Sequence, residues 1–160
     1  MKNNRLLIHF LFLLGVIITQ AYFPIIYIGS IIISPDITLV YISIMAILFG
    51  RFTIIFLAFF LGLAQDLISQ VALIGLFSFI KSLSAYFIGS INLHKSVWNR
   101  NIKYIVLMAT YFIHFFLYFY IVINDALSWY MILQYSIFQS IFTLAIFWIL
   151  NIFIFRRKLI

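Results

Sequence analysis

The chain has 160 residues, of which 67% are hydrophobic and only 8% are charged. Soluble domains are about 45–50% apolar and about 25% charged, so this chain has too few polar residues to cover a globule that faces water. The composition therefore indicates an integral membrane protein. It excludes a soluble enzyme, a nucleic-acid-binding domain and a disordered tail.

Six apolar runs predict the membrane-spanning helices, because a crossing needs about 20 mainly apolar residues. In chain order, the runs are residues 6–22, 37–49, 52–68, 71–91, 102–123 and 129–155. The second run is short, and the last is long enough to tilt or to begin at the interface. The first run resembles a signal peptide, but Gln20-Ala21-Tyr22-Phe23 lacks a small-x-small cleavage site, so we interpret it as a retained span. We predict one all-α membrane domain over residues 1–160, a six-helix bundle.

The basic residues predict the orientation of these spans, because Lys and Arg collect on the cytoplasmic side of a membrane protein. If the N-terminus is cytoplasmic, the outer loops carry no basic residue, and nine of the ten fall on the cytoplasmic side. Merging the second and third runs would leave five crossings and place the basic C-terminal residues outside. We therefore predict six crossings with both termini in the cytoplasm. The nine residues are Lys2, Arg5, Arg51, Lys95, Arg100, Lys103, Arg156, Arg157 and Lys158.

Two loop segments stand out. Residues 23–34 are too apolar for an ordinary loop, and we expect them to lie in the outer interface or to re-enter the bundle. The next residues predict a helix start, with Ser34 as N-cap, Pro35 at the first helical position and Asp36 in the first turn. The link over residues 92–101 is polar and basic. It is an orientation signal or a contact for anionic lipids or a cytoplasmic partner.

Two charged residues fall inside the apolar runs, where charges are costly and usually face the bundle interior. Asp66 lies late in the third run and Lys81 lies about ten residues into the fourth. Because a lysine side chain can extend toward the outer face, we expect these two residues to form a pair or a water-bridged contact. The pair is a substrate or proton site, or a structural clasp between adjacent helices. We favour the clasp because a transporter would usually show more than one buried charge pair.

A stripe of small or polar residues runs along the fourth span at spacings of three and four, and a matching face lies on the third. Such stripes let helix backbones approach closely in a membrane. We therefore predict that the third and fourth spans pack against each other. The residues are Ala58 and Gly62 on the third span, and Gly75, Ser78, Ser82, Ala85 and Gly89 on or next to the fourth.

The sequence gives no catalytic or metal-binding motif. It has no cysteine, and its three histidines lie in separate segments without nearby carboxylates in the sequence, so we predict no metal site and no cofactor. Serines such as Ser84 show no sequence sign of an activating His and Asp, so we predict no enzyme activity. We interpret the aromatic residues of the fifth run, Tyr104, Tyr111, Phe115 and Tyr118, as lipid-facing bulk.

The order of several short motifs resembles the MreD family of bacterial rod shape-determining membrane proteins. The motifs cover residues 35–89, while elsewhere only length and topology agree. Gln70 departs from the pattern, because the family often has a glycine there. The motifs are Pro35-Asp36, Gly62-Leu63-Ala64-Gln65-Asp66-Leu67, Ile74-Gly75-Leu76 and Lys81-Ser82-Leu83-Ser84-Ala85-Tyr86-Phe87-Ile88-Gly89.

This resemblance implies a non-enzymatic scaffold subunit of the cell-elongation machinery, in the bacterial inner membrane, that supports cell shape and peptidoglycan synthesis. The partners it implies are membrane lipids, MreC and, through MreC, the actin-like MreB, RodA and a penicillin-binding transpeptidase. No nucleic acid is implied. The family is also similar in fold to the substrate-binding S-components of energy-coupling-factor transporters, which gives the alternative of a vitamin or small-solute carrier. A carrier should have a polar, aromatic-lined cavity near the outer face and a small-residue surface on its first span.

Overall fold

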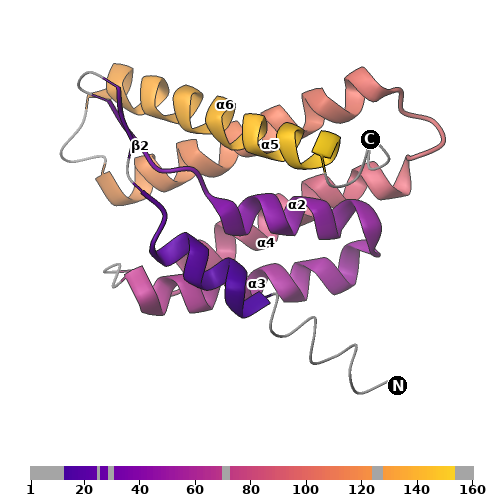
Figure 1. The fold of residues 1–160 in the computed structure, drawn as a ribbon, viewed down its shortest axis with the longest axis horizontal. Coiled ribbons are helices and arrows are strands. Elements are labelled where there is room, and N and C mark those ends of the chain that lie inside the picture. Colours follow the sequence, from indigo (N-terminus) through magenta and orange to yellow (C-terminus); the bar gives the residue numbers. More distant parts are fainter. Residues whose placement is uncertain (1–12, 25, 29–30, 70–72, 124–127, 154–160) are drawn as a thin grey trace.

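The computed structural model describes residues 13–24, 26–28, 31–69, 73–123 and 128–153. Within these ranges the regular elements are helices and one two-stranded antiparallel sheet (Figure 1). Residues 13–21 form the described part of a first helix. The elements that follow are β1 (Ile26–Ile28), β2 (Ile31–Ile33), α2 (Ile37–Leu48), α3 (Arg51–Ser69), α4 (Leu76–Leu93), α5 (Arg100–Ile123) and α6 (Trp129–Phe153).

Among the described residues, four helices, α3 to α6, are long and apolar enough to cross a membrane, which makes the chain a multi-pass membrane protein. The helix α2 has 12 residues and is about 18 Å long, well short of the roughly 30 Å hydrocarbon core of a bilayer. The helices lie on the apolar runs expected from the sequence, although α4 begins at Leu76, five residues later than its run. The count of six crossings and the single-domain organisation remain predictions.

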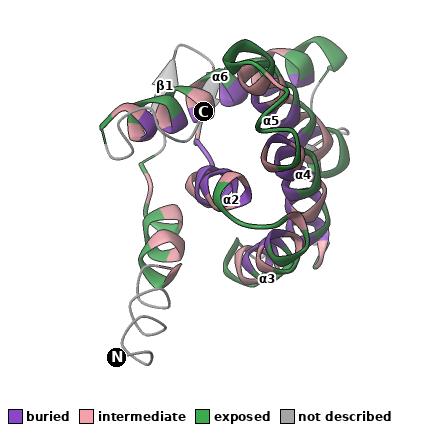
Figure 2. Cartoon of the chain, turned by 90° about the vertical axis from the view of Figure 1, so that its right-hand side faces the viewer, coloured by how far each residue is buried: buried purple, intermediate pink, exposed green. Residues whose placement is uncertain are grey.

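The short helix α2 is the centre of the bundle. It contacts α3, α4 and α6, and Figure 2 shows it enclosed by the other helices. Its residues are apolar on almost every side, which is typical of a helix buried on all faces. At its C-terminal end, Asn92 of α4 donates a hydrogen bond from Nδ2 to the carbonyl of Ile47 at 2.5 Å. This contact satisfies one of the carbonyls that a helix end leaves without an internal partner.

The antiparallel helices α3 and α4 make the most extensive contact of any pair. A Cβ atom built on Gly62 would lie 2.5 Å from Ser78 N and 2.6 Å from the Phe77 carbonyl carbon, so only glycine fits. At the other end of the contact, Gly89 packs against the side chain of Arg51. We call this contact the α3–α4 seam; Gly62, Ser78 and Gly89 are the small residues whose contacts define it.

Of the expected packing stripe, Gly62, Ser78 and Gly89 make contacts across this seam. Ala58 and Ala85 are buried and Ser82 is half-buried, and their place in the stripe stays a prediction. Gly75 is an exception, because it precedes α4 as its N-cap and no atom lies within 4 Å of a Cβ built on it. Its φ of 99° is in the left-handed region, which favours glycine. Gly75 therefore allows the turn before α4 and does not pack in the seam.

Residues 26–33 include a feature that the all-α prediction missed. The strands β1 and β2 pair antiparallel, with Ile26 opposite Ile33 and Ile28 opposite Ile31. Strand β2 also contacts α6. The sequence signal was there, because β-branched residues flank the pair Gly29-Ser30, a two-residue spacing typical of hairpins. The interface and re-entrant interpretations both overlooked this pairing.

The expected helix start at residues 34–36 was wrong by two residues. The N-cap of α2 is Asp36, whose carboxylate accepts from the backbone N–H of Leu39 at 2.7 Å. Ser34 and Pro35 lie outside the helix, and the N–H of Ser34 donates to Gln139 Oε1 on α6 at 3.2 Å. A carboxylate is as good an N-cap as a serine hydroxyl, so sequence preference alone did not choose between Ser34 and Asp36.

Candidate functional site

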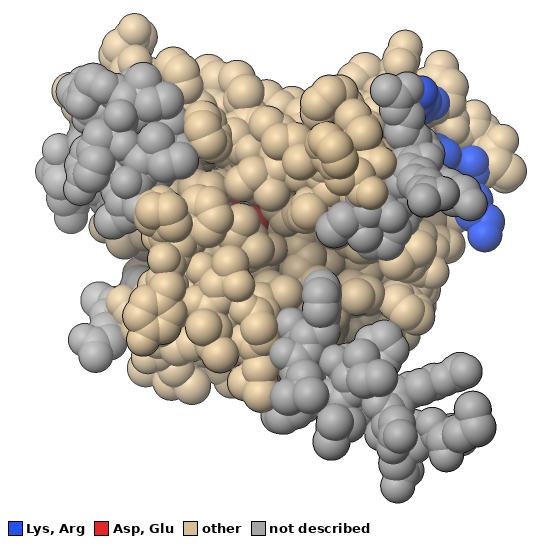
Figure 3. Space-filling model, viewed as in Figure 1, with Lys and Arg blue, Asp and Glu red and all other residues tan. Residues whose placement is uncertain are grey.

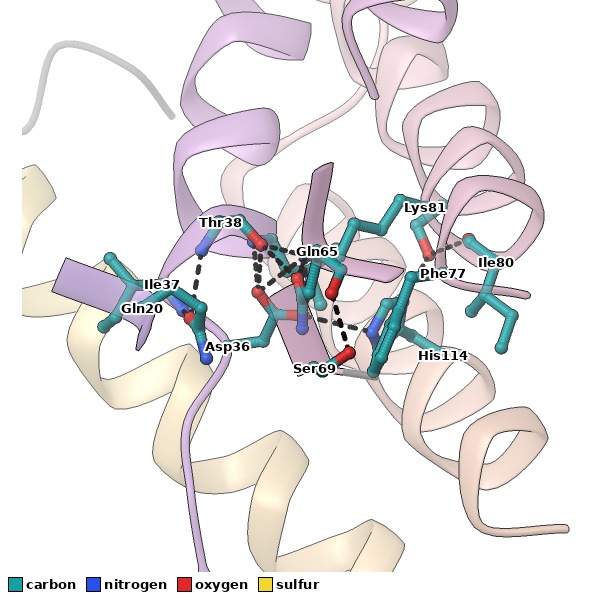
Figure 4. Close-up of polar contacts among 12 residues, drawn as sticks. Gln20, Asp36, Ile37, Thr38, Gln65, Ser69, Phe77, Ile80, Lys81 and His114 are labelled. Atoms are coloured by element: carbon teal, nitrogen blue, oxygen red, sulfur yellow. Dashed lines mark hydrogen bonds and ion pairs between the residues drawn. The ribbon is translucent and has the colours of Figure 1, made fainter. Parts of the chain in front are cut away.

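Lys81 is completely buried, with 0% of its surface exposed, and its charge is balanced by Asp36. The Nζ atom lies 2.9 Å from Asp36 Oδ2, and it also donates to Thr38 Oγ1 and to Gln65 Oε1 (Figure 4). The direct ion-pair partner of Lys81 is therefore Asp36 and not the expected Asp66. Counting residues along α3 and α4 suggested a neighbour on the next helix, whereas Asp36 reaches Lys81 from the start of α2.

The carboxylate of Asp36 both caps α2 and forms the ion pair with Lys81. Its Oδ1 atom caps α2 and also accepts from Thr38 Oγ1 at 2.6 Å and from Lys81 Nζ at 3.0 Å. A buried ion pair is tolerable only when further hydrogen bonds satisfy both partners, and here they do. The pair thus ties the N-terminal end of α2 to the interior of α4.

Asp66 has a different role, as a cap for α4 supplied by the preceding helix. Its carboxylate accepts from the backbone N–H groups of Gly75 at 3.1 Å, Phe77 at 3.0 Å and Ser78 at 3.3 Å, and from Ser78 Oγ at 3.2 Å. Because the N-cap Gly75 has no side chain, Asp66 satisfies the free N–H groups in its place. The negative charge also lies where the helix dipole favours it.

His114 of α5 completes the group around Lys81. Its Nε2 atom lies 3.4 Å from Asp36 Oδ2, and its Nδ1 atom lies 3.2 Å from Ser84 Oγ. We call the residues Asp36, Thr38, Gln65, Lys81 and His114 the polar cluster. It joins α2, α3, α4 and α5 at one level of the bundle.

The row of Ser84, His114 and Asp36 corrects the expectation that no serine has a His–Asp arrangement. Residue types match those of a hydrolase triad, but the hydroxyl of Ser84 donates to the Ile80 carbonyl at 2.9 Å. The direction of the 3.2 Å contact between Ser84 Oγ and His114 Nδ1 depends on the tautomer of the ring. Ser84 does not line the cavity described next, in contrast to His114 and Asp36.

A cavity of about 400 Å³ lies beside the polar cluster. Five of its eleven lining residues are Phe or Tyr, and its polar side chains come from five segments of the chain. The ring of Phe77 stacks on Tyr118 with centroids 5.1 Å apart. The lining residues are Gln20, Ser34, Asp36, Gln65, Phe77, His114, Phe115, Tyr118, Phe119, Tyr135 and Gln139.

The aromatic residues of α5 were thus partly misinterpreted as lipid-facing. Tyr111 and Phe115 are buried, and Phe115 and Tyr118 line the cavity. The prediction failed because an aromatic residue on an apolar helix has the same sequence pattern whether it faces lipid or the bundle interior. A smaller cavity of about 220 Å³ adjoins the first through Gln20 and Gln65, which line both.

Sequence reasoning missed five polar residues of this region: Gln20, Thr38, Gln65, His114 and Gln139. Each is a polar side chain in a mainly apolar run, which is the one signal that could have singled them out. In the described part of the chain, no group of three or more His, Cys, Asp or Glu side chains is arranged to hold a metal ion.

The fold and the site together define a class, a multi-pass helical membrane protein clasped by a buried ion pair next to an aromatic cavity. The model of the family described as rod shape-determining protein MreD matches residues 1–159. The chain therefore belongs to the MreD family, which implies a role in the determination of rod shape. No curated protein and no solved structure matches the chain.

Proposed function

We propose that this chain is a non-enzymatic membrane scaffold of the cell-elongation complex, which supports peptidoglycan synthesis in the bacterial cytoplasmic membrane. The family match over residues 1–159 is the observation that carries the proposal. The polar cluster supports it, because Lys81 and Asp36 bond to groups of the chain itself, as a rigid framework requires.

The proposed partners are MreC and, through it, MreB, RodA and a penicillin-binding transpeptidase. The basic end of the bundle supports a cytoplasmic contact. Figure 3 shows the visible Lys and Arg gathered at one end of the molecule. The described residues at this end, where α3 begins and α4 joins α5, are Arg51, Lys95, Arg100 and Lys103.

Depletion in a rod-shaped bacterium tests the scaffold. We expect depleted cells to round or swell, because wall synthesis loses its link to the cytoskeletal filament, and MreC to co-purify with the chain in mild detergent. The exposed control Tyr130→Phe, which lies outside the basic end and the polar cluster, should restore shape in depleted cells, whereas Lys81→Met should not. Normal shape after depletion would contradict the proposal.

The proposed topology has its own test, helped by the absence of native cysteine. Single cysteines at Asn4, Lys95 and Lys158 should resist an impermeant thiol reagent in intact cells, because these positions are predicted to be cytoplasmic. A cysteine at Asp125 should react. Reaction at Lys95 in intact cells would overturn the arrangement of six crossings.

A solute carrier is the second candidate, and the aromatic cavity is the observation that favours it. The first span offers less support, because its only small residues at a helical spacing are Gly15 and Thr19. In a carrier, Asp36→Asn or Lys81→Met would each abolish uptake of a solute while leaving cell shape normal. Vitamin-dependent growth of depleted cells with normal shape would select this candidate over the scaffold.

A further inference from the structure

We propose that the aromatic cavity binds a small, uncharged, planar molecule whose edge carries hydrogen-bond acceptors. The inference stands on the cavity itself, and it holds whether the chain is a scaffold or a carrier. Its volume of about 400 Å³ is in the range of small-molecule sites, which are mostly apolar with a few convergent polar groups.

The planar shape follows from the walls. Phe77 and Tyr118 form one near-parallel pair, with 22° between the rings, and Phe119 and Tyr135 form a second pair that is tilted by 44°, with centroids 5.6 Å apart. Residues of α4, α5 and α6 thus present aromatic rings to the same space. Aromatic side chains favour offset stacking with another ring, so a flat ligand gains more from these walls than a branched one.

The absence of charge follows from the polar cluster. Asp36 is the acidic residue among those that line the cavity, and its carboxylate already accepts from Lys81, Thr38 and the N–H of Leu39. An ion entering the cavity would lose its hydration without finding a free counter-charge in this lining. Burial of an unpaired charge is strongly unfavourable, so the site selects against ions.

We infer the hydrogen-bond acceptors on the ligand from two glutamines that line the cavity. Gln20 Oε1 accepts from the backbone N–H groups of Ile37 at 2.6 Å and Thr38 at 3.4 Å. Gln65 Oε1 accepts from Lys81 Nζ and lies 3.0 Å from Thr38 Oγ1. Because both carbonyl oxygens are engaged by the protein, the remaining polar group of each side chain is its Nε2 amide, which only donates. A ligand that meets these donors must bring carbonyl or ring-nitrogen acceptors.

The site lies in the half of the bundle away from the basic residues. Its lining includes the first turns of α2 and α4, the first half of α6 and the second halves of α3 and α5. Figure 3 shows a hollow in the middle of the face that contains this region, with acidic surface at its bottom. With the proposed topology, the ligand would reach the cavity from the outer side of the membrane.

The probe is 1,3-dimethyllumazine, an uncharged flat bicycle with ring carbonyls and no N–H donor; its 6-carboxylate is the charged comparison. The full-length chain in lipid nanodiscs carries one cysteine, either Ser34→Cys in this cavity or Ser69→Cys in the smaller one. At ten times its Kd, the probe should slow the reaction of Ser34→Cys with N-ethylmaleimide about tenfold. The rate at Ser69→Cys should stay unchanged, and the carboxylate should protect neither.

Equilibrium dialysis with the unmodified chain gives a second measurement that does not depend on a cysteine variant. We expect saturable binding of one probe per chain, which Ser34→Phe abolishes by filling the cavity and the matched Ser69→Phe preserves. Absence of saturable binding, equal protection at both cysteines, or equal binding of the carboxylate would overturn the proposal. Native mass spectrometry that finds a phospholipid retained by the unmodified chain and lost in Ser34→Phe would also overturn it, in favour of an acyl chain. Cell shape is not a readout here, so failure of this proposal and failure of the scaffold are separable.

Discussion

The α3–α4 seam and the polar cluster share Lys81's helix, but they hold the bundle together by different means. The seam joins two helices that are consecutive in the chain. It depends on close backbone packing, because there is no room for a methyl group at Gly62. The cluster joins four helices and depends on a buried ion pair. Lys81 and Asp36 have only 0% and 4% of their surfaces exposed, so each needs the other's charge. Added side-chain volume should therefore destabilise the seam, and removal of one charged partner should destabilise the cluster.

Removal of the cluster's cation should have the largest effect. Lys81→Met leaves the buried carboxylate of Asp36 without its ion-pair partner, and breaking a buried pair costs about 3–5 kcal/mol. Thermal unfolding of the purified protein in detergent should show this loss as a much lower melting temperature. Lys95→Met, at an exposed site, is the control and should melt like the unmodified chain. Similar melting of both variants would show that the ion pair does not hold the cluster.

Added side-chain volume in the seam should give the second-largest loss of stability. Gly62→Ala drives a methyl group into the backbone of Ser78 and Phe77, and overpacking of this kind costs about 1–3 kcal/mol. Gly15→Ala is the matched control, because Gly15 is also helical and no atom lies within 4 Å of its added Cβ. It should be neutral or stabilising by up to about 1 kcal/mol, the helix preference for alanine. A lower melting temperature for both variants would mean that the seam is not the cause.

Double substitutions sharpen the assignment of partners. Asp36→Asn with Lys81→Met should be milder than the sum of the single changes, with a coupling of about 1–3 kcal/mol, because the two groups touch. Asp66→Asn with Lys81→Met should be closer to additive, since Asp66 acts on the N-terminus of α4. The larger coupling appearing for Asp66 instead would restore the pair expected from the sequence.

Gly89→Ala tests whether all seam glycines are equivalent. Its added Cβ would lie 3.0 Å from Arg51 Cγ, a side-chain atom that can shift, rather than against backbone. We expect a cost of about 1 kcal/mol or less, the low end of the overpacking range. Melting temperatures of Gly62→Ala and Gly89→Ala, measured together, should therefore differ. An equal loss would mean that the backbone contact at Gly62 has no special weight.

Loss of an uncharged hydrogen bond to α2 should lower the stability of the bundle least. Tyr111→Phe removes the bond from Tyr111 Oη to Ser43 Oγ at 2.8 Å, and a typical hydrogen bond contributes about 0.5–1.5 kcal/mol. Tyr130→Phe is the control, because Tyr130 is exposed. A loss at Tyr111 as large as that of Lys81→Met would contradict the greater weight that we give to charge.

The amino-acid sequence by itself determined the membrane class, the apolar runs and most of the α3–α4 seam. These features depend on composition and on spacing within one helix, so a repeat of three and four residues along the fourth run could single out Ser78 and Gly89. The resemblance of residues 35–89 to the MreD family was also visible, and the family match confirms it.

Only the tertiary structure decided the partner of Lys81, the role of Asp66 and the existence of the cavity. Asp36 and His114 lie 45 residues before and 33 residues after Lys81 in the sequence, and no periodicity links them across three helices. Their meeting depends on α2 lying at the centre of the bundle, with its N-terminal end at the level of Lys81. The cavity exists for a related reason, because large aromatic side chains of α4, α5 and α6 surround a space that no side chain fills. Such a space depends on how neighbouring helices pack, which the pattern along one helix does not encode.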